Sequence, residues 1–138
     1  DWRAAVGLSV AGFVAIFLLP FLKYPANPPA VGNPDTIGRR TALYLVALGW
    51  SVIATWGGWR AWRAFLARDM GLHQAVPATT AVWVALAAIG LVALPASPDP
   101  VAAPATLIWQ FRIATLAGAL TLWSVLGMTF GWLRTTRP

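Results

Sequence analysis

The sequence contains no cysteine and very little charge. The absence of cysteine from all 138 residues excludes disulfide frameworks, thiolate metal sites and cysteine nucleophiles. Charged residues make up 10% of the chain and hydrophobic residues 59%, whereas a soluble domain is about 25% charged and about 45–50% apolar. A soluble globule of this size could not cover itself with polar side chains, and the same composition excludes disorder. The chain is therefore predicted to be an integral membrane protein.

Four apolar runs organise the sequence, each near the roughly 20 residues that cross a bilayer as a helix. They predict an all-α fold, an integral membrane bundle of about four transmembrane helices that forms one domain, residues 1–138. The expected spans are residues 4–22, 41–59, 76–94 and 107–133. Such unbroken runs cannot close a strand barrel. Because the first residue is Asp1 rather than Met, we expect that an N-terminal segment is missing.

The net charge of +6 indicates topology rather than nucleic-acid binding, because the positive residues lie at the ends of the apolar runs. One side of the membrane is expected to hold six of them, and the other side four. The six are Arg3, Arg60, Arg63, Arg68, Arg134 and Arg137, and the four are Lys23, Arg39, Arg40 and Arg112. This bias places both ends of the chain in the cytoplasm and predicts contact with lipid headgroups.

The predicted spans contain no Asp, Glu or His. Proton-coupled carriers usually place such a residue inside the membrane, so a self-contained proton-driven transporter is disfavoured. The chain also lacks a nucleophile paired with a base and a glycine-rich nucleotide loop, which argues against an enzyme.

The single histidine, His73, lies in the loop after the second span, with Met70 three residues before it. One interpretation is a metal ligand, and the other is an interfacial loop histidine. A complete metal site would need further ligands from another chain or from the missing segment.

The first loop, residues 23–40, is rich in prolines, which fix φ and remove backbone donors. Asn27, Asn33 and Asp35 add side-chain oxygens to its carbonyls, and oxygens of this kind suit hard cations. The alternative is a rigid cap over the bundle, in which Asp35 or Thr36 caps the second helix. The pair Arg39–Arg40 then opposes the dipole of that helix, and either pairs with Asp35 or contacts lipid phosphate.

Two other patterns concern helix packing and the membrane boundary. Gly127 and Gly131 form a GxxxG motif that lets helices approach closely, within one chain or between subunits. Most of the nine tryptophans lie near the ends of predicted spans, as in an interfacial aromatic belt. For Trp83 and Trp123, which lie within spans, contact with a pigment or quinone is the alternative to packing.

Two blocks of this sequence resemble a known family. PFLKYPANPPAVGNPDTIGRRTALYL (Pro20 to Leu45) closely resembles the signature of the CbtA family, and LIWQFRIATLAGALTLWSVLGMTFGWL (Leu107 to Leu133) resembles its last membrane helix. The chain corresponds to the C-terminal membrane region of members that look longer, with a further N-terminal span. We call residues 23–40 the signature loop. The residues that carry the resemblance there are Lys23, Tyr24, Pro25, Asn27, Pro28, Pro29, Gly32, Arg39 and Arg40.

The resemblance implies a subunit of a cobalt or other divalent-metal uptake system in the bacterial inner membrane. It also implies a small single-span partner, CbtB, whose His-rich end would supply the ligands that this chain lacks. On these grounds Asn27, Asp35 and His73 are the candidate metal-contacting residues, cobalt is expected as the transported ion, and no resident cofactor is expected. Relatives tend to carry more acids in the loop before the last helix, where this chain has only Asp99.

A second hypothesis comes from the residues themselves. The Trp-rich spans and the absence of any catalytic constellation also fit a non-catalytic accessory subunit of a larger photosynthetic or respiratory membrane complex.

Overall fold

The computed structural model describes residues 2–99 and 102–135, and its described residues are helical, with no strand. The elements are α1 (Trp2–Gly12), η1 (Phe13–Leu18), α2 (Leu19–Lys23), η2 (Pro34–Thr36), α3 (Ile37–Leu66), α4 (Leu72–Ala93) and α5 (Ala105–Thr135). Four of the helical stretches are long and apolar enough to cross a membrane. The predicted all-α fold with four transmembrane helices is therefore confirmed.

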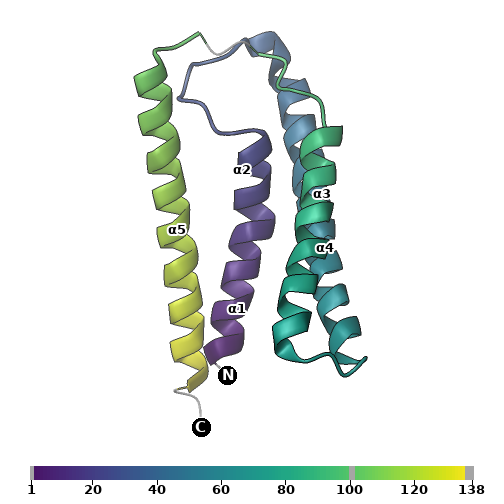
Figure 1. Cartoon of the computed structure of the whole chain (residues 1–138). Helices are drawn as coiled ribbons and strands as arrows, with labels where there is room; N and C mark the ends of the chain where they lie inside the picture. Colours follow the sequence, from purple (N-terminus) through teal and green to yellow (C-terminus); the bar gives the residue numbers. More distant parts are fainter. Residues whose placement is uncertain (1, 100–101, 136–138) are drawn as a thin grey trace.

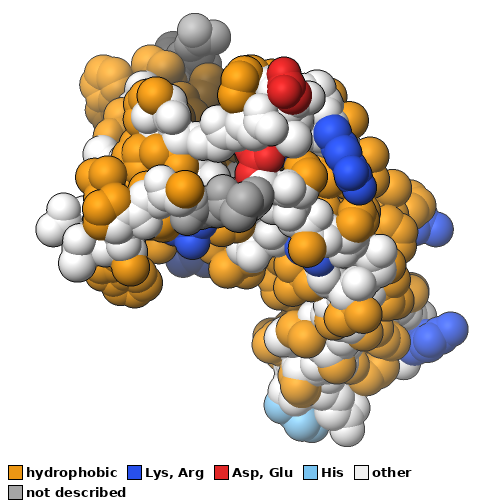
Figure 2. Space-filling model, turned by 90° about the horizontal axis from the view of Figure 1, so that it is seen from above, with side chains coloured by type: hydrophobic (Ala, Val, Ile, Leu, Met, Phe, Trp, Pro, Cys, Tyr) orange, Lys and Arg blue, Asp and Glu red, His pale blue; other side chains and the backbone are white. Residues whose placement is uncertain are grey.

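The chain runs up and down in sequence, so that its two ends lie at the same end of the bundle as the short turn between α3 and α4 (Figure 1). The signature loop and the loop between α4 and α5 lie together at the opposite end, which we call the loop end. Seen from the loop end, the outline of the molecule is bent rather than round (Figure 2). Two helix pairs produce this shape, because α5 packs chiefly along α1, and α4 packs chiefly along α3.

The first transmembrane helix contains a π-helical stretch, η1, directly before Pro20. A proline inside a helix cannot donate to the carbonyl four residues earlier, and its ring clashes with that carbonyl. One wider turn relieves the clash, and the Leu19 N–H accordingly donates to the carbonyl of Val14, five residues back. In this way α1, η1 and α2 form one continuous span, Trp2–Lys23.

The α3–α4 pair is held together by small residues into which tryptophans fit. Seven buried residues lie in these two helices: Ala47, Ser51, Ala54 and Gly58 of α3, and Ala75, Ala87 and Gly90 of α4. Trp50 packs directly against Gly90, and its indole N–H donates to the Leu86 carbonyl at 2.8 Å. Trp83 packs in the same way on Gly58, where an added Cβ would lie 3.1 Å from its ring. Membrane helices associate by such close packing, since lipid is as apolar as the helices themselves.

The α1–α5 pair uses the same principle with Gly127 and Gly131, both of them buried. A Cβ added to Gly127 would lie 2.8 Å from the Cβ of Ser9, and one added to Gly131 would lie 3.5 Å from the Cβ of Trp2. Trp123 of α5 packs directly on Gly12 of α1. The glycines of the GxxxG motif thus face α1 of the same chain, and Trp83 and Trp123 both fill notches between helices.

Helix α3, the second transmembrane helix, differs most in length from the span expected for it. It begins at Ile37 and ends at Leu66, whereas the apolar run predicts residues 41–59. Hydropathy marks only the part of a helix that lies in the hydrocarbon, and nothing in the sequence breaks the helix between Trp59 and the turn at 67–69. Arg60 and Arg63 therefore extend from a helix, over the faces of Trp56 and Trp59, and not from a loop.

Candidate functional site at the loop end

The signature loop is fastened to the loop that precedes α5 through Asp99. Its carboxylate forms an ion pair with Arg40, with 3.0 Å between Oδ2 and Nε, and only 2% of the Asp99 side chain is exposed. The same carboxylate accepts hydrogen bonds from the Asn33 N–H at 3.1 Å and from the Thr36 hydroxyl at 2.5 Å. One buried acid thus holds the start of α3 and the turn before it.

The turn that receives Asp99 depends on a glycine. Gly32 has φ +116°, in a region that side-chain-bearing residues rarely adopt. A Cβ at this position would also lie 2.9 Å from both Arg40 Nη1 and Asp99 Oδ2. Gly32 therefore provides both the backbone conformation and the space that the ion pair needs.

The capping of this segment differs from the prediction. The Asn33 side chain accepts the hydrogen bond from the Asp35 N–H and caps η2, while Thr36 stands at the start of α3 without a capping bond from its side chain. Thr36 thus occupies the predicted N-cap position of α3, but the prediction that its side chain or that of Asp35 makes the capping bond is wrong. The single hydroxyl proton of Thr36 is shared between the Asp99 carboxylate and the Asn33 carbonyl instead.

Helix α5 reaches the signature loop through Arg112. Its Nε donates to the Ala26 carbonyl at 3.3 Å, and its Nη2 donates to the Asn27 side-chain oxygen at 3.1 Å. These two bonds hold the first proline-flanked stretch of the loop against α5, although Asn27 and Arg112 are 85 residues apart in sequence.

Helix α4 and the loop after it hold the beginning of the signature loop. Lys23 Nζ donates to the Leu91 carbonyl at 2.7 Å, in the last turn of α4, where a helix attracts positive charge. The Tyr24 hydroxyl donates to the Pro95 carbonyl at 2.7 Å. Partial burial raises the pKa of Tyr24 above its ordinary value of 10.0. The loop is thus bonded to α4, to α5 and to the segment that joins them.

A cavity of ≈ 530 Å³ lies beneath the signature loop. Its polar lining comes from Tyr24, Asn27, Arg40, Thr41, Tyr44, Ser97 and Arg112. The few charged side chains at this end lie among hydrophobic ones (Figure 2). Lys23, Arg39, Arg40 and Arg112 stand against Asp35 and Asp99, so four positive charges face two negative ones. The balance is positive, and Arg40 already neutralises Asp99.

The three candidate metal-contacting residues do not come together. Asn27 lies in the cavity wall, and its side-chain oxygen is occupied by Arg112. Asp35 is exposed on η2 at the same end. His73 is exposed near the start of α4, at the other end of the bundle (Figure 1). Among residues 2–99 and 102–135, no three His, Asp or Glu side chains lie close enough to hold a metal ion.

Sequence reasoning missed the importance of Asp99 and Arg112. Asp99 was the one charge in its proline-rich loop, which is a signal that the residue has a specific partner. Arg112 lay just inside an apolar run, where a charge is costly unless it is bonded. The partners of both residues lie 59 to 86 positions away in sequence.

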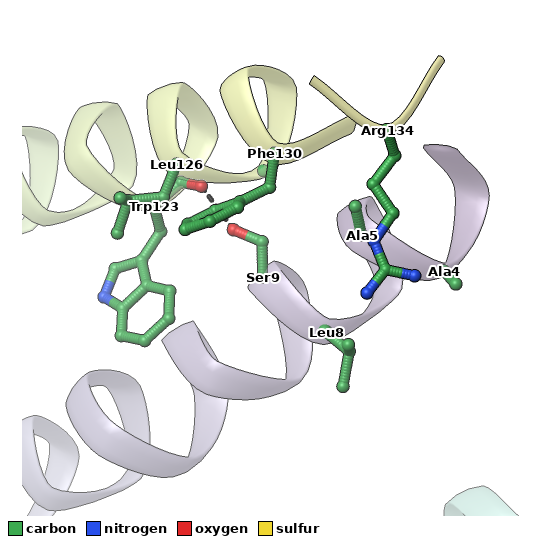
Figure 3. A pocket seen from close by; sticks show the side chains of 9 residues that line it. Ala4, Ala5, Leu8, Ser9, Trp123, Leu126, Phe130 and Arg134 are labelled. Carbon is green, nitrogen blue, oxygen red and sulfur yellow. Dashed lines mark hydrogen bonds between the residues drawn. The ribbon is translucent and has the colours of Figure 1, made fainter. Parts of the chain in front are cut away.

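A second hollow lies between α1 and α5, with a volume of ≈ 280 Å³ (Figure 3). Leu8, Leu126 and Phe130 contribute to its largely apolar wall, and the Ser9 hydroxyl donates to the Trp123 carbonyl across it. Arg134 extends over its outer end, near Ala5. An apolar lining with its hydroxyl already bonded fits a lipid chain better than a metal ion.

All the elements that meet at the loop end lie within a region that matches one known protein family. The family described as "Probable cobalt transporter subunit (CbtA)" matches residues 1–135. The chain belongs to the CbtA family. The match covers both the signature loop and α5, so the elements that meet at the loop end all lie within the family's region. No curated protein and no solved structure matches the chain. It is a multi-pass membrane protein of a transporter-subunit family.

Proposed function

We propose that this chain is a membrane subunit of a cobalt, or other divalent-metal, uptake system and that it acts with a small partner protein. Family membership carries the proposal, and the four membrane-length helices are consistent with it. The same family assignment supports a non-enzymatic role.

The charge distribution supports the need for a partner. Asp35 is the exposed second residue of the candidate span Pro34–Leu66, whereas Asp99 lies outside the candidate spans and is paired with Arg40. The loop end carries more positive than negative charge, so it repels a bare divalent cation unless a second chain brings ligands. A small single-span subunit with a His-rich end, of the CbtB kind, provides suitable ligands.

Within this chain we propose that Asn27 and Asp35 act where the metal enters. Asp35 is an exposed carboxylate at the loop end, and Asn27 belongs to the cavity below it. His73 is too far from them to share a site, and we propose that it contacts metal, if a partner supplies further ligands, at the opposite end of the bundle.

The topology that goes with this function places both chain ends and His73 in the cytoplasm and the loop end outside. The six-to-four distribution of Lys and Arg supports this orientation in a bacterial inner membrane. Single cysteines in place of Ser97 and Arg68 test it, because the chain has no other cysteine. In intact cells an impermeant thiol reagent should label the first and not the second, and labelling at position 68 alone would reverse the orientation.

The experiment that tests the proposed function is cobalt entry into proteoliposomes. Vesicles are prepared with this chain alone, with the partner alone and with both, and internal cobalt is measured. We expect entry only with both chains. Equal entry in empty vesicles and in vesicles with both chains contradicts an uptake role. Stable co-purification with pigment- or haem-containing subunits instead supports an accessory subunit of a photosynthetic or respiratory complex.

A further inference from the structure

Arg112 carries a partly buried positive charge that no carboxylate in the described ranges balances. Its two acceptors, the Ala26 carbonyl and the Asn27 amide oxygen, are both neutral. The ion pair found within residues 2–99 and 102–135 joins Arg40 and Asp99 instead. A guanidinium has five N–H donors in a planar fork, and these two bonds leave part of that fork unused. An uncompensated cation away from bulk water is unfavourable, so a counter-ion would stabilise it.

The surroundings of Arg112 favour an anion. Besides apolar residues, the wall of the cavity of ≈ 530 Å³ contains Arg112 and the hydroxyl-bearing residues Thr41, Tyr44 and Ser97. Two further donors of the wall are already engaged, because Tyr24 donates to the Pro95 carbonyl and Arg40 pairs with Asp99. Asp99 does not belong to this lining, and it has already neutralised Arg40. The remaining charge at the cavity is therefore positive, and hydrogen-bond donors around it match an oxyanion.

The depth of Arg112 in the bundle identifies which oxyanions can reach it. Helix α5 has 31 residues, so it is about 46 Å long and exceeds a hydrocarbon core of about 30 Å by about 8 Å at each end. Arg112 lies about 10 Å along the axis from Ala105, the first residue of the helix. This position is about 2 Å inside the boundary of the core, from which the long side chain of an arginine can extend to the level of phospholipid phosphates.

We propose that the cavity beneath the signature loop binds a phosphate oxyanion through Arg112, supplied by a phospholipid headgroup or by free phosphate. Asn27 is a positioning residue in this site, because its amide oxygen holds the guanidinium at the cavity wall. The bound phosphate would complete the charge balance of the loop end. This inference concerns an anion and does not rest on the identity of the transported metal, although the anion site shares Asn27 with the proposed metal entry.

The test is native mass spectrometry of the full chain in detergent, with phosphatidylglycerol, phosphatidylcholine or inorganic phosphate as the probe. Arg112→Gln removes the charge, and Arg39→Gln removes an exposed charge at the same end, outside the cavity lining. We expect Arg112→Gln to weaken phosphate or phospholipid binding about tenfold or more, as for the loss of a charge-assisted bond. Arg39→Gln should leave it within about twofold, as for an exposed charge.

A second variant keeps the proposal testable if Arg112→Gln loosens the loop. In Asn27→Asp the new side chain has the shape of asparagine and places a carboxylate 3.1 Å from Arg112. The variant therefore keeps the contact that holds the loop, and its own carboxylate neutralises the charge of Arg112. We expect this variant to lose the bound phosphate. If phospholipid stays bound when inorganic phosphate is added, the headgroup is the source of the oxyanion. If inorganic phosphate displaces the phospholipid, free phosphate is the source. Equal weakening by Arg112→Gln and Arg39→Gln, wild-type binding by Asn27→Asp, or no binding of any probe would overturn the proposal.

Discussion

Asp99 and Arg40 form an ion pair across the loop end, with 3.0 Å between Oδ2 and Nε. Asp99 lies on the loop between α4 and α5, and Arg40 lies in the first turn of α3, so the ion pair ties the loop that connects the two helix pairs to the beginning of α3. It also places a buried carboxylate directly beside the cavity that Arg40 lines.

Substitution Asp99→Asn should destabilise the fold. The amide offers one acceptor oxygen where the carboxylate accepts from the Asn33 N–H and the Thr36 hydroxyl, and Arg40 loses its counter-charge. Breaking a buried ion pair costs about 3–5 kcal/mol, and we expect about 1–3 kcal/mol because Arg40 is 28% exposed. The measurement is the free energy of unfolding in mixed micelles as SDS is increased.

Two controls accompany Asp99→Asn. Asp35→Asn removes an exposed carboxylate of the same loop and should change the unfolding free energy by less than about 0.5 kcal/mol. The double substitution Arg40→Gln with Asp99→Asn should cost less than the sum of the single changes, because the second change removes no further pair. Additive costs would show that the ion pair makes no stabilising contribution.

Substitution Gly32→Ala should also open the loop end. The alanine would combine φ +116° with a Cβ 2.9 Å from both Arg40 and Asp99, and we expect a loss of about 1–3 kcal/mol. Gly38→Ala is the matched control, since Gly38 lies in α3 with no atom within 4 Å of an added Cβ. The control should be neutral or slightly stabilising, because alanine favours a helix. The measurement is the rate of limited proteolysis of the signature loop in detergent, which should rise for Gly32→Ala and not for Gly38→Ala. Equal cleavage of the two variants would contradict the prediction.

Substitution Gly127→Val should separate α1 from α5. A Cβ at this position meets Ser9 at 2.8 Å and lies 3.7 Å from the Val6 backbone, so the helices must move apart. Overpacking of this kind costs about 1–3 kcal/mol. Gly118→Val is the control on the same helix, where an added Cβ meets nothing within 4 Å. The thermal midpoint of detergent-solubilised protein should fall for the first variant only, and similar midpoints for both would show that α1 and α5 do not pack closely at Gly127.

Substitution Asp35→Asn should lower cobalt uptake by cells that contain the whole system. The exposed carboxylate attracts cations to the loop end. A carboxylate and a divalent cation about 4 Å apart in water attract each other by about 2 kcal/mol, which sets an upper limit of about thirtyfold on the effect. Asp69→Asn is the control, because Asp69 is an exposed acid at the opposite end whose φ of 57° asparagine tolerates. Equal uptake by the two variants would remove Asp35 from the proposed entry site.

The general architecture could be predicted because it depends on local composition. The four apolar runs correspond to four helices, and the glycines at 127 and 131 face a neighbouring helix in the structure. The π-helical turn before Pro20 also has a local cause, although the apolar run alone does not reveal it. The length of α3 was missed because hydropathy does not register a helix that continues into the interface.

The contacts at the loop end could not be predicted, because they join residues that are distant in sequence. The sequence predicts that Arg39 and Arg40 pair with Asp35 or contact lipid phosphate, whereas in the structure Arg40 pairs with Asp99. Likewise, a tryptophan in a span gives no sign of which glycine it covers, yet Trp83 and Trp123 cover Gly58 and Gly12. These contacts depend on how neighbouring helices pack against each other, and hydrophobic periodicity does not specify that packing.

The measurement that tests the central claim most directly is cobalt accumulation in cells from which the gene for this chain is deleted. Radioactive cobalt is supplied at trace concentration, with the partner gene intact, and the deleted chain is then restored from a plasmid. The account predicts that accumulation falls on deletion and returns on restoration. Unchanged accumulation in the deleted cells would contradict an uptake role for this protein.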